Sequence, residues 1–177
     1  MVSIGPYTQS LNFTHQFDLH PAKVAPARPR NSLWGALQTN PKFSAFRSIV
    51  ERAKMEGILN DPQTDLTLFV PSDDYLDPPP GYLENMDMLT ARKLVQFATL
   101  NRKISLALVR ASPVIQLVTK LPANKLYVTT LNCRTVLNGG AVLLHGDVEV
   151  DNGMIHVVDR IMVPSRLTTA GYYSQTY

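Results

Sequence analysis

The chain has 177 residues, 45% of them hydrophobic, which is enough for one domain with a buried core and room for tails. Its net charge of +3 comes from residues spread along the sequence and is too small to indicate nucleic-acid binding by itself. The single cysteine, Cys133, excludes an internal disulfide, and no apolar run approaches the roughly 20 residues of a membrane-spanning helix. The first ten residues also lack the basic-then-apolar pattern of a secretion signal.

Residues 1–31 predict an extended, proline-rich N-terminal arm, because prolines recur and hydrophobic periodicity is absent. At about 3.3 Å per residue, such an arm reaches on the order of 100 Å when it is fully stretched. We therefore interpret it as a segment that can contact a distant partner. Its candidate partner-binding residues are Pro21, Lys23, Pro26, Arg28, Pro29 and Arg30.

Two helices are predicted next. A short one begins after Asn31 or Ser32, either of which can cap its first turn. A longer one begins after Asn40, and we expect it to end at Gly57. Its apolar residues recur at helical spacing and form a single stripe, which consists of Phe43, Phe46, Ile49, Val50 and Ala53.

The middle of the chain predicts one strand followed by three helices. The strand covers 66–71, and Ser72 with its acidic neighbours suits the start of a short helix. A rigid proline loop at 77–81 separates this from an amphipathic helix around 91–98. A further helix is predicted over 112–121 from the spacing of Val114, Leu117, Val118 and Leu121.

From Lys125 onward the pattern changes to short β-rich runs, at 126–130, 134–137, 141–145, 148–150 and 154–163. Turns are predicted at 138–140 and 151–153, where Asn, Asp and Gly tolerate positive φ. Helices in the first two thirds and strands at the end predict an α+β fold. Residues 165–177 form a tyrosine-rich C-terminal tail.

Two segments carry a family resemblance. The first runs from Thr67 to Leu76 as an apolar strand, a proline and an acidic helix start, and the second runs from Asn152 to Pro164. Together, in this order and at this separation, they resemble the two signature motifs of the fasciclin-like (fasciclin/beta-Ig-h3) domain family. The resemblance covers one copy over residues 32–164. The matching motif residues are Thr67, Phe69, Pro71, Ser72, Asp73, Asn152, Gly153, His156, Asp159 and Pro164.

The resemblance implies an α+β domain with a β-wedge-like core and a non-enzymatic role in protein–protein interaction or adhesion. The motif residues are then scaffold, and no cofactor or small-molecule substrate is expected. The chain departs from the family at Phe97-Ala98, where most members carry a Tyr-His pair. This puts any adhesion role that depends on that pair in question.

Two settings for such a module stay open. Most family members are exported, but some large DNA viruses encode intracellular relatives. The absence of a signal favours a structural component of a large assembly, such as a minor capsid or cementing protein in a virion. The alternative is an extracellular or cell-surface adhesion protein that binds matrix, carbohydrate or itself.

Several residues invite a chemical role and have a structural alternative. His156 lies in a strand and suits a hydrogen-bonded structural histidine, while Asp159 suits bracing of nearby backbone. In a continuous strand, alternate acidic and histidine side chains line one face that either holds a divalent cation or is simply solvated. These side chains are His145, Asp147, Glu149 and Asp151.

An enzyme is not expected, because the common hydrolase, nucleotide and zinc motifs are missing from the sequence. Scattered His and Asp residues leave a hydrolase or metal-dependent enzyme as a third hypothesis. Cys133 is interpreted as a packing residue. The basic pairs Arg92-Lys93 and Arg102-Lys103 suit either a binding patch or the solvated side of a helix.

Overall fold

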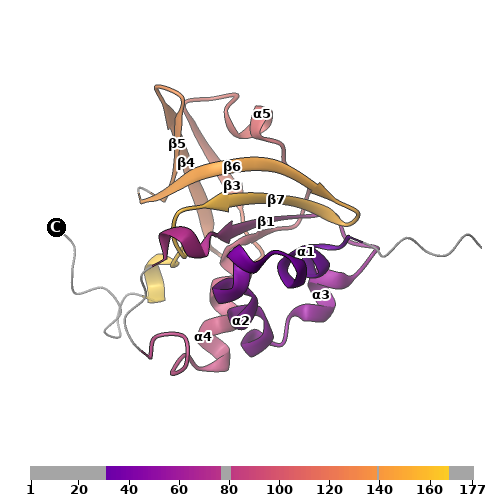
Figure 1. Ribbon diagram of the computed structural model, residues 1–177. Helices are drawn as coiled ribbons and strands as arrows, with labels where there is room; N and C mark the ends of the chain where they lie inside the picture. The colour runs from indigo at the N-terminus through magenta and orange to yellow at the C-terminus, as the bar shows by residue number, and fades with distance from the viewer. Residues whose placement is uncertain (1–30, 77–80, 139, 168–177) are drawn as a thin grey trace, which may run out of the picture.

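The computed structural model describes residues 31–76, 81–138 and 140–167 (Figure 1). The predicted arm, apart from Asn31, lies outside the described residues, as do most of the proline loop and the tail beyond Leu167.

Helices form the first layer of the domain. Four of them, α1–α4, gather on one side of the strands β1 and β7, whereas α5 lies on the other side (Figure 1). Within the described residues, no helix has the length and apolar character needed to cross a membrane. The helices are α1 (Leu33–Thr39), α2 (Ser44–Ala53), α3 (Glu56–Asn60), α4 (Met88–Phe97) and α5 (Leu106–Val109), with 3₁₀ turns η1 (Pro41–Phe43), η2 (Asp73–Tyr75) and η3 (Ser165–Leu167).

A seven-stranded sheet forms the rest of the domain, in the order β2-β1-β7-β6-β5-β4-β3. Its strands are β1 (Leu66–Pro71), β2 (Thr99–Leu100), β3 (Val114–Val118), β4 (Lys125–Leu131), β5 (Arg134–Leu137), β6 (Ala141–Val150) and β7 (Gly153–Val158). β1 and β7 are parallel, and the other neighbours are antiparallel. A bridge between Leu100 and Thr119 brings the two outermost strands together, so the sheet curls into a wedge. The α+β prediction is confirmed.

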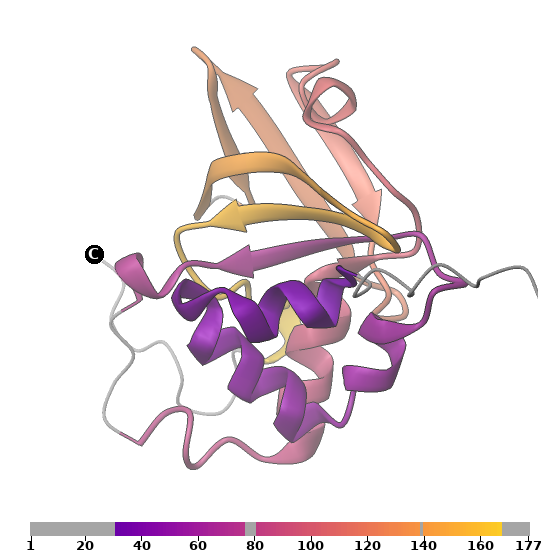
Figure 2. The same cartoon turned by 45° about the vertical axis from the view of Figure 1, so that its right-hand side comes forward.

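The core lies on both sides of β1 and β7. Every residue of these two strands is buried, because the helices cover one face and the curled sheet covers the other (Figure 2). Their nearly continuous apolar sequences are typical of strands that are covered on both faces. The predicted stripe of α2 and the apolar face of α4 pack into this core through Phe46, Ile49, Val50, Leu94 and Val95.

The helix predicted over 112–121 is wrong, because this segment forms β3. Five of its residues pair with β4, from Val114 opposite Thr129 to Val118 opposite Lys125. Leu117 faces the core while Val114 and Val118 are exposed, which is a two-residue period. The segment is rich in β-branched and apolar residues, and pairing with β4 outweighs the helical spacing.

The predicted end of the second helix at Gly57 is also wrong. α2 ends at Ala53, and Lys54 adopts a left-handed conformation with φ of 55°. The backbone N–H of Met55 then bonds to the Val50 carbonyl at 3.3 Å, and the Met55 side chain is buried. Gly57 instead lies inside α3. The chain therefore turns at Lys54, a position without a glycine, and the residue after the turn, Met55, is buried in the core.

The last two strands and their hairpin also differ from the prediction. The runs 141–145 and 148–150 form one strand, β6, which contains two irregularities in its pairing with β7. β7 ends at Val158 rather than at residue 163. In the hairpin between β6 and β7, neither Asp151 nor Asn152 has a positive φ, and Gly153 begins β7.

Candidate functional site

The two sequence motifs come together as adjacent parallel strands in the centre of the sheet. The register runs from Leu66 beside Gly153 to Pro71 beside Val158. Phe69 lies beside His156, and their ring centroids are 5.3 Å apart. Figure 2 shows β1 and β7 side by side above α1 and α2. The motif residues therefore belong to the interior of the domain.

His156 is fully buried, and both ring nitrogens have partners. Nδ1 accepts a hydrogen bond from the backbone N–H of Asp147 at 3.2 Å, which leaves the proton on Nε2. Nε2 donates to the carbonyl oxygen of Ile104 at 2.7 Å. Burial lowers the pKa of His156, although the bond to Ile104 and the charge of Asp147 oppose this change. The neutral imidazole thus joins β7 to β6 and to the segment before α5.

Thr67 binds the same segment from β1. Its hydroxyl donates to the carbonyl of Arg102 and accepts from the backbone N–H of Ile104, both at 2.8 Å. The side chain of Ile104 is buried in the core. Thr67 and His156 thus fix the connection between β2 and α5.

Asp73 caps a helix remote from it in sequence. Its carboxylate accepts hydrogen bonds from the backbone N–H of Ser44 at 2.9 Å, from the Ser44 hydroxyl, and from the N–H of Ala45 at 3.2 Å. These groups lie at the N-terminus of α2, where a negative charge is favourable. Asp74 instead forms an exposed ion pair with Lys42. Ser72 starts the short turn η2, as predicted.

Asn152 joins three elements through one buried amide. Its oxygen accepts from the backbone N–H of Leu33 at 2.8 Å, at the start of α1. Its nitrogen donates to the carbonyls of Leu59 and Asp61 at 2.9 and 3.0 Å, at the end of α3. The backbone carbonyl of Asn152 also accepts from Leu66 in β1. The sequence predicted only a turn here, and an Asn in a turn carries no signal of these contacts.

Gly153 is required by close packing. A Cβ atom at this position would lie 2.1 Å from the carbonyl oxygen of Leu66, in the neighbouring strand. The backbone of β1 therefore approaches β7 too closely for any side chain at residue 153.

Asp159 braces the start of β6. Its Oδ1 accepts from the backbone N–H of Val142 at 2.8 Å, and Arg160 binds both carboxylate oxygens. Partial burial raises the pKa of Asp159, but the hydrogen bonds from Arg160 and Val142 outweigh it and lower the pKa below its ordinary value. Pro71 and Pro164 are buried near the ends of the two motifs.

The four side chains proposed to share one face of a strand do not do so. Between His145 and Val148, β6 bulges, and Asp147 has φ of 57°. Its carboxylate accepts from the N–H of Leu106 at 2.8 Å, while Glu149 pairs with Lys103. In the described part of the chain, no three His, Cys, Asp or Glu residues are grouped to hold a metal ion.

The packing role expected for Cys133 is wrong. Asn132 and Cys133 form the turn between β4 and β5, with φ of 49° and 62°. Two consecutive residues with positive φ match the turn type that closes tight hairpins. Cys133 is therefore exposed at the hairpin tip.

One side chain of each basic pair makes a contact within the domain. Arg92 donates to the carbonyl of Ala53, at the end of α2, and Lys103 pairs with Glu149. Phe97 and Ala98, at the place of the family's Tyr-His pair, are both buried at the end of α4.

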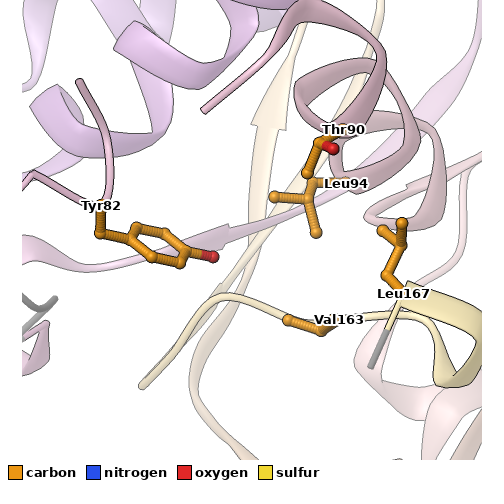
Figure 3. Close-up of a pocket in the computed structure, with 5 residues that line it drawn as sticks. All are labelled: Tyr82, Thr90, Leu94, Val163 and Leu167. Carbon is orange, nitrogen blue, oxygen red and sulfur yellow. The ribbon is translucent and has the colours of Figure 1, made fainter. Parts of the chain in front are cut away.

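A small pocket lies between α4 and the end of the described chain (Figure 3). Tyr82, Thr90, Leu94, Val163 and Leu167 line it, and its volume is about 20 Å³. This is room for about one water molecule and far below the size of a typical ligand site.

Comparison with known proteins agrees with this architecture. The model of the fasciclin domain family matches residues 41–164. The putative FAS1 domain-containing protein 081L of Invertebrate iridescent virus 3 is 26% identical over 139 residues, which cover 70% of this chain and 77% of that protein.

Among solved structures, a FAS1 domain pair from the insect cell adhesion molecule Fasciclin I is similar, with a TM-score of 0.63 and 20% identity. The match covers 77% of this chain and 52% of the Fasciclin I chain, so our chain spans about half the length of that structure. At this identity the likeness concerns the fold. The family match over residues 41–164 shows that the chain belongs to the fasciclin domain family, whose domain is an adhesion-type module.

Proposed function

We propose that this chain is a non-enzymatic protein-binding module and a structural component of a large assembly, such as a minor capsid or cementing protein of a large DNA virus. The observation that carries the proposal is the similarity to an iridescent-virus protein over 77% of that protein's length. A relative that consists mostly of this domain favours a role that one fasciclin domain performs without a partner domain in the same chain.

The internal use of polar side chains supports a non-enzymatic role. His156, Thr67 and Asp73 are the motif residues most suited to chemistry, and each one binds backbone groups of the domain. Among the described residues, no buried side-chain nitrogen or oxygen lacks a hydrogen-bond partner. These groups act as scaffold in our proposal, and the surface performs the binding.

The terminal segments complete the proposal. Residues 1–31 serve as a tether to a neighbour in the assembly through the arm residues Pro21 to Arg30, and the tyrosine-rich tail from residue 165 engages another. This part rests on the proline, basic and tyrosine content of the sequence.

Limited proteolysis tests the assembly role. The chain alone and the chain within its native assembly are digested in parallel, and cleavage within residues 1–31 is mapped by mass spectrometry. We expect protection in the assembly and cleavage in the isolated chain. Equal cleavage in both samples would contradict the tether, and failure of the chain to co-sediment with the assembly would contradict the structural role.

A cell-surface adhesion role is the second candidate. Its support is the shared fold with the domain pair of Fasciclin I, a cell adhesion molecule. Beads coated with the chain test it directly. Self-aggregation, or retention on matrix proteins or glycans, would favour adhesion, whereas inert beads together with a positive co-sedimentation result would favour the assembly role.

A further inference from the structure

The strands β3 and β4 lie in the part of the sheet away from α1–α4 (Figures 1 and 2). Four exposed apolar side chains form a strip on their outer face. The exposed fractions of Val114, Val118, Tyr127 and Leu131 are 61%, 70%, 50% and 69%. We call these four residues the β3–β4 strip. The alternate side chains Leu117, Leu126 and Val128 are buried on the inner face. The two strands thus bury one apolar face in the core and expose a second one to solvent.

The backbone at the edge of the sheet is open beside this strip. β3 is the last strand in the sheet order. The backbone N–H of Thr130 donates to the Pro113 carbonyl at 2.8 Å, and the backbone N–H of Thr119 donates to the Asn124 carbonyl at 3.4 Å. The odd-numbered residues of β3 therefore direct their backbone groups to β4. In an antiparallel pair the alternate residues direct their N–H and C=O groups to the other side.

Those alternate residues are Val114, Gln116 and Val118, which we call the open edge. Two residues further on, the backbone N–H of Lys120 donates to the Thr99 carbonyl at 2.7 Å, so β2 closes the sheet at this point. Within the described chain, no strand pairs with the open edge before the bridge between Thr119 and Leu100. Exposed apolar edges of this kind pair readily with another strand.

The charged residues of the sequence segment that contains the strip all have one sign. Between Asp87 and Asp147 the sequence contains no Asp or Glu, and its basic residues are Arg92, Lys93, Arg102, Lys103, Arg110, Lys120, Lys125 and Arg134. Lys125 lies over the outer face, where its Nζ is 3.3 Å from the side-chain oxygen of Gln116. Arg134 is paired with Leu131 at the other end of β4. Cations thus flank the strip at both ends, which favours an acidic partner.

We propose that the open edge of β3 binds an extended segment of a partner protein in which acidic residues alternate with apolar ones. The segment adds to the sheet as a further strand. Main-chain hydrogen bonds to Val114, Gln116 and Val118 provide affinity, and alternate side chains provide specificity. Its acidic side chains lie on the outer face near Lys120 and Lys125, and its apolar side chains extend the inner face beside Ile115 and Leu117. This inference rests on the proposed protein-binding function and specifies its surface.

A second copy of the chain is the competing occupant. The sequence Val-Ile-Gln-Leu-Val has the same chemical pattern in both directions, so two copies of β3 can align antiparallel about Gln116. Such a pair would join two sheets whose flanking charges are Lys120, Lys125 and Arg134 from both copies. Repulsion between like charges opposes this arrangement, and an acidic segment removes it.

A peptide titration tests the proposal on the full chain. The probe is a blocked heptapeptide of alternating Val and Glu, and its control has Lys in place of Glu. We expect saturable NMR shifts of the backbone amides of Val114, Gln116 and Val118 with the Glu peptide. Binding should weaken as salt is raised and should be at least about ten-fold weaker for the Lys peptide. Absence of shifts, shifts elsewhere, or equal binding of both peptides would overturn the proposal.

Two matched variants isolate the backbone contact. Gln116→Pro removes the backbone N–H at the centre of the open edge. Gln116→Ala removes the Gln116 side chain as well but keeps this N–H. We expect the Pro variant to bind the Glu peptide about ten-fold more weakly than the Ala variant. If the Pro variant does not fold, N-methylation of alternate peptide residues removes the reciprocal donors and should cause a similar loss on the unaltered chain. Equal affinity in these comparisons would refute strand addition.

Sedimentation of the chain without peptide tests whether a second copy of the chain occupies the open edge. A dimer that Gln116→Pro dissociates and Gln116→Ala preserves would overturn the acidic-segment proposal. Co-sedimentation with the native assembly, unaffected by Gln116→Pro, would refute this surface while leaving the proposed function intact. If neither the unaltered chain nor any variant co-sediments with the native assembly, the proposed function itself is rejected.

Discussion

Thr67 and His156 bind the two backbone groups of the same residue, Ile104, from adjacent parallel strands. The hydroxyl of Thr67 accepts from its N–H at 2.8 Å, and Nε2 of His156 donates to its carbonyl at 2.7 Å. One residue from each family motif thus holds a connection that belongs to neither motif. The two motifs thus share a structural role at Ile104.

Replacement of His156 should destabilise the domain strongly. His156→Ala leaves the buried Ile104 carbonyl without its donor and the Asp147 N–H without its acceptor, and it creates a cavity beside Phe69. We expect a loss of about 3 to 5 kcal/mol in the free energy of unfolding, measured by urea denaturation. His156→Gln retains a donor amide and should lose less. An equal loss in both variants would show that packing, rather than the hydrogen bond to Ile104, dominates.

Stability should fall in mildly acidic solution because of the same residue. The folded state holds the pKa of His156 below its ordinary value of 6.5, so below that pH the unfolded chain takes up a proton that the folded chain does not. The contribution of the neutral His156 to the free energy of unfolding is complete above pH 6.5 and is lost as the pH falls from there toward the lower pKa of the folded state. The free energy of unfolding then changes by at most about 1.4 kcal/mol per pH unit. Denaturation at a series of pH values measures it, and His156→Gln should flatten this part of the profile. An unchanged profile in the variant would assign the pH dependence to other groups.

Asn152→Asp tests whether the amide nitrogen matters. The new carboxylate keeps the acceptor for Leu33 but faces the carbonyls of Leu59 and Asp61 in place of a donor. We expect a loss of about 2 to 4 kcal/mol in unfolding free energy. The matched control is Asn138→Asp, because Asn138 is exposed and its side-chain oxygen accepts from Tyr127. That variant should change stability by less than about 0.5 kcal/mol. Similar effects at both positions would contradict the role of Asn152.

Alanine at two glycines should have opposite effects. Gly153→Ala places a Cβ against the Leu66 carbonyl and should cost about 3 kcal/mol or more, by separating β1 from β7. Gly57→Ala, in the exposed part of α3 with no atom within 4 Å of the new Cβ, should stabilise by about 0.5 to 1 kcal/mol. Thermal unfolding of both variants provides the measurement. A tolerated Gly153→Ala would mean that the two strands can separate without loss.

The adjacent acidic residues of the first motif should differ in importance. Asp73→Ala removes the cap of α2 and should cost about 1 to 2 kcal/mol. Asp74→Ala removes only an exposed ion pair with Lys42 and should leave stability nearly unchanged. Chemical denaturation of the two variants side by side decides this, and an equal cost would show that Asp73 acts merely as a surface charge.

The sequence predicted the elements better than their contacts. The helix that begins after Ser32, the strand at 66–71 and the hairpins that turn at 138–140 and 151–153 follow from capping residues, turn residues and periodicity, and they are confirmed. Val114–Val118 was misassigned because its apolar spacing fits a helix, and only pairing with β4 decides the outcome.

The motif residues were identified without their partners. Asp73 caps a helix 29 residues earlier in the chain, and Asn152 binds Leu33, 119 residues away. No local pattern encodes such contacts, since a capping Asp and a turn Asn look alike wherever their partners lie. The bulge that turns Asp147 toward Leu106 was missed for the same reason.

The parallel pairing of β1 with β7 also sets the order in which the domain can be completed. The two central strands begin at Leu66 and Gly153, so nearly all of the fasciclin domain must be synthesised before they meet. Until β7 leaves the ribosome, the apolar residues of β1 have no neighbour on that side, and Asn152 cannot join α1 to α3. Long-range pairing of this kind slows folding and exposes apolar strands during synthesis. We therefore expect the nascent domain to become stable only when its last strand arrives, and a chain that stops at Val150 to remain unfolded rather than to form a smaller module.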